Sequence, residues 1–144
     1  MESTLAYYHE VASQINVISS LLAGFSIAIV SNLMTSKSDK KINNAILIIA
    51  TFASCCFLVA SFAMTKIMMI TTEGYSVEVT RRNFEIPNMI GGPSFFTGVL
   101  ALCIVVSLSG WTKSKNIGIV TTIMGIITLI MLSLAMTESI YATQ

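Results

Sequence analysis

Between Val11 and Met34 the chain reads VASQINVISSLLAGFSIAIVSNLM, about two dozen residues without a charged side chain. An α-helix rises about 1.5 Å per residue, so this stretch is long enough to cross a hydrocarbon core of about 30 Å. Unlike the other apolar stretches of the chain, it carries polar and small residues in a regular pattern. We therefore expect a membrane-spanning helix with two distinct faces.

Helical periodicity sorts this stretch into two opposite faces. One face is polar at both ends and apolar in the middle, and it consists of Glu10, Gln14, Val17, Leu21, Gly24, Phe25, Ala28 and Asn32. The opposite face is made of small residues, namely Ala12, Ser19, Ala23, Ser26 and Val30. Small faces let membrane helices approach closely. We expect this back face to pack on another helix, which leaves the first face free.

The free face, which we call the α-stripe, has two interpretations. In a central position of an oligomer it would line an axial path, because its two polar ends would form the mouths of that path. Alternatively, Gln14 and Asn32 simply lie at the two membrane interfaces, where polar side chains cost little.

Composition places the whole chain in a membrane. Of its 144 residues, 54% are hydrophobic and 10% are charged, and the mean hydropathy is +0.80. Soluble domains carry about 25% charged residues. The sequence predicts an all-α, multi-pass integral membrane protein with a single domain, residues 1–144, and four spans at residues 11–34, 42–69, 94–111 and 116–141.

The long connection and the fourth span carry further signals. Residues 71–88 mix acidic and basic side chains, and Pro87 with Gly91-Gly92-Pro93 predicts where an irregular loop ends. Alternation over residues 75–79 hints at a short strand, and a helical extension of the second span is the other possibility. In the fourth span, Gly118 and Gly125 are seven residues apart, which predicts a close-packing seam.

Basic residues lie unevenly around the predicted spans. The two short connections contain Lys37, Lys40, Lys41, Lys113 and Lys115, whereas the long connection contains Arg81 and Arg82. The positive-inside rule then places both chain ends outside the cytoplasm.

The residues needed for catalysis are missing from the predicted spans. Membrane enzymes and coupled transporters need ionisable groups at depth, but the chain has one histidine and seven acidic residues, and no acidic, histidine or arginine side chain lies near the centre of a span. Three cysteines show no metal-ligand spacing. We expect neither enzyme activity nor a metal or cofactor, and the net charge of +1 does not favour nucleic acid.

Short runs in all four spans resemble the Orai family of calcium channels, in the same order along the chain. The run Ser20–Ala28, SLLAGFSIA, is similar to the family's first helix, and Phe52–Ala60 with Phe62-Ala63-Met64 is similar to the second. Trp111-Thr112-Lys113 resembles the end of the third helix, and Thr121–Met124 resembles a run in the fourth. The resemblance implies a ring-shaped homo-oligomer with the first helix innermost and both chain ends in the cytoplasm, against the lysine distribution.

The resemblance also implies site residues and two departures. Leu21, Gly24, Phe25 and Ala28 correspond to the apolar pore section. Asn32 stands where the family has its acidic selectivity residue, so an amide would replace the carboxylate that binds Ca²⁺ by charge. His9, Ser13 and Val17 stand at the family's basic positions, so no basic ring exists.

Together these features favour an oligomeric ion channel, cation-conducting and Orai-like, with a pore lined by the α-stripe. Its expected partners are the lipid bilayer, further copies of the chain and permeant ions. Two alternatives remain: a non-conducting membrane anchor or interaction subunit that docks a protein partner through residues 71–88, and a membrane-permeabilising effector.

Overall fold

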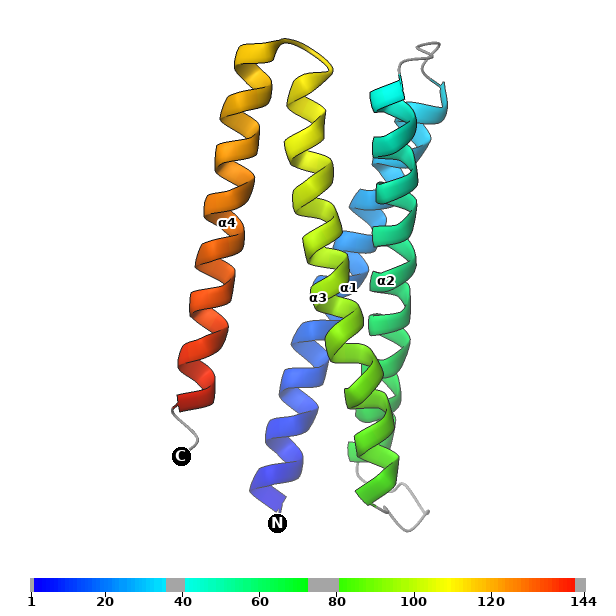
Figure 1. Ribbon diagram of the computed structural model, residues 1–144. Helices are drawn as coiled ribbons and strands as arrows, with labels where there is room; N and C mark the ends of the chain where they lie inside the picture. Colours follow the sequence, from blue (N-terminus) through cyan, green and yellow to red (C-terminus); the bar gives the residue numbers. More distant parts are fainter. Residues whose placement is uncertain (1, 36–40, 73–80, 142–144) are drawn as a thin grey trace.

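The chain folds into four long α-helices. The structure is a computed structural model that describes the backbone of residues 2–35, 41–72 and 81–141 and the side chains of residues 6–35, 41–72 and 85–134. The helices are α1 (Glu2–Thr35), α2 (Lys41–Thr71), α3 (Arg81–Trp111) and α4 (Lys115–Tyr141) (Figure 1). All four are long and apolar enough to cross a membrane. The all-α fold is therefore confirmed, and four helices of this length and composition support a multi-pass membrane protein.

Helix α3 begins earlier than the sequence predicted. We expected an irregular loop over residues 71–88 and a span from residue 94, but the helix starts at Arg81 and continues through Pro87 and Pro93. A proline removes one backbone hydrogen bond of a helix. Hydrocarbon offers the backbone no other partners, so the helix continues past each proline. The strand suggested over residues 75–79 lies outside the described residues.

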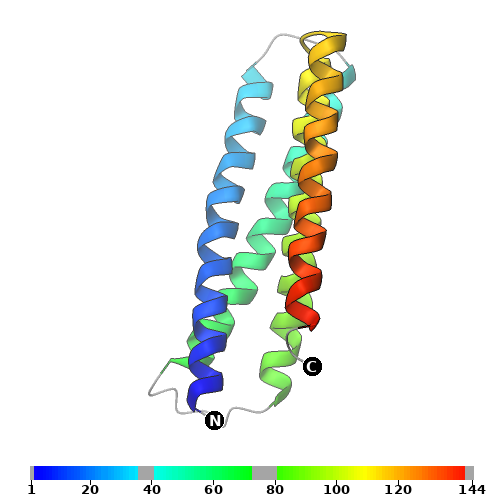
Figure 2. The same ribbon diagram turned by 90° about the vertical axis from the view of Figure 1, so that its left-hand side faces the viewer.

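Neighbouring helices in the sequence are neighbours in space. The main packed pairs are α1 with α2, α2 with α3 and α3 with α4. Figure 2 shows that α1 and α4 stand apart as two side walls, with α2 and α3 behind them. The four helices thus form a trough and not a closed bundle.

The start of α1 and the end of α4 lie at one end of this trough (Figure 1). The end of α1, the start of α2 and the α3–α4 turn at residues 112–114 lie at the other end. We call this second end the lysine end, because Lys41, Lys113 and Lys115 lie there with exposed side chains.

The back face of α1 packs on the rest of the molecule as expected. Ala12, Ser19, Ala23 and Ser26 are all buried, whereas Val30 is half-buried. The largest group in the core is Phe57 on α2, which is fully buried and packs edge-on against Phe95 of α3 at a ring-centroid distance of 6.1 Å. Small residues around one large aromatic ring bring three helices together.

Glycines set the spacing of the other two helix pairs. A Cβ atom on Gly98 of α3 would lie 2.9 Å from the Phe57 ring, so only glycine allows this approach to α2. On α4, Gly118 lies against the Trp111 ring and Gly125 lies against Ser107, both on α3. The predicted seam of the fourth span is confirmed, and α3 of the same chain fills it.

Candidate functional site: the α-stripe and an adjoining cleft

Most of the α-stripe faces away from the protomer. All eight of its residues are exposed, although the back of the same helix is buried. Leu21, in the apolar middle, is 70% exposed and is the most exposed large apolar residue of the stripe, ahead of Val17 and Phe25 at 57% each. Such a surface is available for contact with lipid or with another copy of the chain.

A hydrogen bond joins two side chains at the polar end of the α-stripe, near the start of α1. The Gln14 side-chain amide donates a 3.3 Å hydrogen bond to the Glu10 carboxylate, one helical turn away. Both side chains are exposed. At this end the stripe therefore presents a carboxylate and an amide on one surface.

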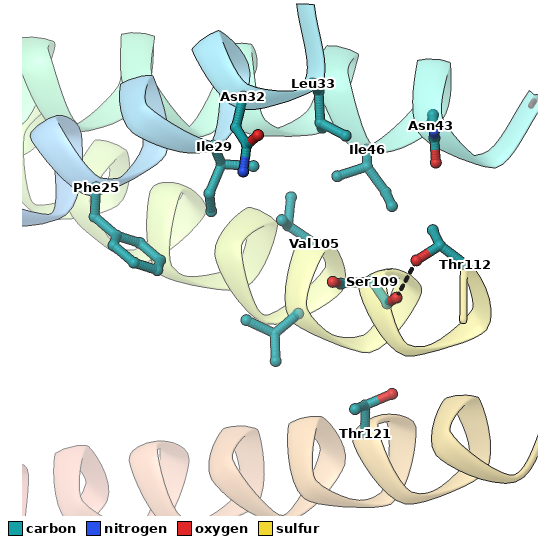
Figure 3. Close-up of a pocket in the computed structure, with 11 residues that line it drawn as sticks. Phe25, Ile29, Asn32, Leu33, Asn43, Ile46, Val105, Ser109, Thr112 and Thr121 are labelled. Atoms are coloured by element: carbon teal, nitrogen blue, oxygen red, sulfur yellow. Dashed lines mark hydrogen bonds between the residues drawn. The ribbon is translucent and has the colours of Figure 1, made fainter. Parts of the chain in front are cut away.

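Two residues of the α-stripe also face into the protomer's trough. Phe25 and Asn32 line a cleft of about 650 Å³ at the lysine end (Figure 3). The six other residues of the stripe do not line it. The structure therefore divides the predicted site between an outer surface, with Leu21 near its middle, and an inner edge.

All four helices contribute to the cleft. From α1 come Phe25, Ile29, Asn32 and Leu33, and from α2 come Asn43 and Ile46. Helix α3 contributes Val105, Val106 and Ser109, the α3–α4 turn contributes Thr112, and α4 contributes Thr121. Figure 3 shows Phe25, Ile29 and Asn32 of α1 pointing toward α3, and Thr121 of α4 pointing toward α3 from the opposite side. The cleft exists because α4 packs on α3 and leaves α1 uncovered on that side.

Hydrogen bonds hold the α3–α4 wall of the cleft. The Thr112 hydroxyl donates to the Ser109 carbonyl over 2.7 Å, and the Thr121 hydroxyl lies 3.1 Å from the Ser107 carbonyl, which links α4 to α3. The Trp111 indole N–H donates to the Thr122 hydroxyl over 3.1 Å. These contacts fix the position of α4 relative to the cleft.

A row of polar contacts joins α1 to α2, and the sequence analysis missed it. Ser61 of α2 donates a 2.5 Å hydrogen bond to the Asn16 side chain and lies 3.2 Å from the Ser20 hydroxyl. Nearer the start of α1, His9 Nδ1 lies 2.8 Å from the Thr71 hydroxyl. The available signal was the four-residue spacing of Asn16 and Ser20, which places both on one side of α1.

Comparisons of the chain with protein-family models, with curated proteins and with solved structures found no match. Within the described residues, no three histidine, cysteine or acidic side chains are grouped closely enough to hold a metal ion. The site must therefore be interpreted from its own geometry.

Proposed function

We propose that the chain is the subunit of an oligomeric ion channel whose pore is lined by the α-stripe of α1. One observation carries this proposal: a helix that is packed on its small face exposes a stripe that is polar at both ends and apolar in the middle. A ring of such helices would cover the stripe and enclose an axial path. The resemblance of the four spans to Orai channels supports the same arrangement.

The mechanism follows from the polarity of the stripe. Leu21, Phe25 and Ala28 form an apolar constriction that opposes hydration and opens when it becomes wet. At one mouth, a ring of Glu10 carboxylates raises the local concentration of cations. At the other mouth, Asn32 supplies amide oxygens without charge, so we expect cations to pass with little preference for Ca²⁺.

Flux through the purified protein in liposomes tests this function. We expect leak of K⁺ or Na⁺ to rise in Leu21→Ser, because a hydroxyl lowers the cost of wetting the constriction. The matched control is Ile48→Ser on α2, whose side chain is 66% exposed. Equal flux in wild type, Leu21→Ser and protein-free liposomes would contradict conduction and would leave the anchor or interaction subunit as the function. If Ile48→Ser raises flux as much as Leu21→Ser does, the result would point to general permeabilisation of the bilayer.

A further inference from the structure

The cleft has the polarity gradient of a lipid molecule along its length. Phe25 and Val106 lie deeper in the membrane-spanning part of the helices, whereas Ser109, Thr112 and Asn32 lie toward the helix ends. Asn32 is seven residues beyond Phe25, which corresponds to about 10 Å along the helix axis. An apolar chain therefore fits the deep part, and ester and hydroxyl groups fit the outer part.

Positive charge gathers at the end of the molecule where the cleft has its outer, polar part. Lys41, Lys113 and Lys115 are exposed at the same end of the helices as Asn43 and Thr112, which line the cleft, although none of the three lysines lines it. The acidic side chains that the structure describes are Glu10 and Glu85, near the opposite end of the helices.

We propose that this cleft binds one anionic phospholipid, with an acyl chain against Ile29 and Val106 and its phosphate at the lysine end. Each lysine near a membrane surface attracts anionic lipid by an amount that corresponds to about a fivefold change in binding. The positive-inside rule, in contrast to the orientation that the Orai resemblance implies, places this end in the cytoplasmic leaflet, where anionic lipids are concentrated. The proposal does not depend on whether the protein conducts ions.

Charge also argues against a second copy of the chain in the cleft. Copies that insert in the same direction place their lysine ends in the same leaflet, so a neighbour seated there would bring lysines close to lysines. An anionic headgroup neutralises this charge. The chemistry of the outer end therefore favours a lipid over another protomer.

Native mass spectrometry of the purified protein in detergent, with phosphatidylglycerol or phosphatidylcholine added, tests this site. We expect one phosphatidylglycerol to remain bound per protomer and to bind more tightly than phosphatidylcholine. Val106→Trp fills the apolar part and should weaken binding of phosphatidylglycerol at least tenfold. Val120→Trp on α4 is the matched control, because Val120 is similarly exposed but does not line the cleft.

A charge series makes the test independent of folding. Lys113→Gln and Lys115→Gln should each lower the preference for phosphatidylglycerol about fivefold, whereas Lys66→Gln, exposed toward the other end of α2, should leave it unchanged. Binding that Val106→Trp leaves intact would overturn the proposal. Loss of self-association in Val106→Trp, with lipid binding unchanged, would also overturn it and would identify the cleft as a contact between copies. Because the readout is bound lipid, a non-conducting protein would not affect the result.

Discussion

The hydroxyl of Ser61 on α2 lies 2.5 Å from the side-chain oxygen of Asn16 on α1, and it donates the hydrogen bond between them. The Asn16 amide in turn lies 3.8 Å from the Met68 sulfur, one further contact along α2. Both helices are long and apolar enough to cross a membrane, where an unpaired amide would have no water to bind. This pair therefore fixes the register of α1 against α2.

Loss of the Ser61 hydroxyl should weaken this contact. In Ser61→Ala, the Asn16 and Ser20 side chains both lose a partner, and hydrogen bonds between membrane helices contribute about 0.6 kcal/mol each on average. We expect the free energy of unfolding in mixed micelles to fall by about 1 kcal/mol. Thr51→Ala is the control, because the Thr51 hydroxyl bonds only to the Leu47 carbonyl of its own helix. If the free energy of unfolding falls by a similar amount in both variants, the Ser61 hydroxyl does not stabilise the contact between α1 and α2.

Close approach at Gly98 should make larger residues costly there. A Cβ atom would meet the Phe57 ring at 2.9 Å, and this ring is fully buried. Gly98→Val should destabilise the protein by about 1–3 kcal/mol, the usual cost of overpacking. Gly24→Val is the matched control, since nothing lies within 4 Å of a Cβ atom at Gly24. Equal unfolding free energies for the two variants would argue against the α2–α3 packing.

Disulfide trapping should test whether the α-stripe faces other copies of the chain. The three native cysteines are free, so the background variant replaces Cys55, Cys56 and Cys103 with alanine. Disulfides require Cα atoms within about 7 Å. If α1 helices surround a narrow axis, Leu21→Cys should give covalent dimers on oxidation in membranes.

Ile48→Cys is the control for this experiment, because Ile48 on α2 is exposed to a similar degree as Leu21. We expect it to stay monomeric on the denaturing gel. Dimers at Ile48 and none at Leu21 would place α2, and not α1, at the contact between copies.

The single tryptophan should report on the α3–α4 turn. Gly118 packs against the Trp111 ring, and a Cβ atom there would lie 2.7 Å from ring carbons. Gly118→Leu should displace the indole and increase quenching of its fluorescence by iodide. Asn116→Leu, at an exposed position one half-turn earlier in α4, should leave quenching unchanged. If iodide quenching increases in neither variant, Gly118 does not hold Trp111 in place.

Local pattern explains which features the sequence could predict. Hydropathy alone identifies four spans, because only long apolar helices satisfy their backbone in hydrocarbon. Periodicity within α1 separates the small face from the α-stripe, and the burial of Ser19 and Ser26 confirms that division. The Gly118 and Gly125 seam was predictable for the same reason, since residues seven apart lie on one side of a helix.

The predicted loop over residues 71–88 shows where local signals fail. Pro87 and Pro93 predict a break in water, but within α3 the helix continues from Arg81 because its backbone has no competing partner in a membrane. Sequence signals calibrated on soluble proteins therefore placed the start of this helix too late.

Sequence alone therefore determined the number of helices, their membrane character and the two faces of α1. Only the tertiary structure decided that Ser61 meets Asn16, that α3 fills the α4 glycine seam, and that Phe25 and Asn32 border a cleft with α3 and α4. The physical reason is that an apolar face is equally compatible with lipid and with another helix. The choice between them depends on close packing and on polar contacts between residues far apart in the chain.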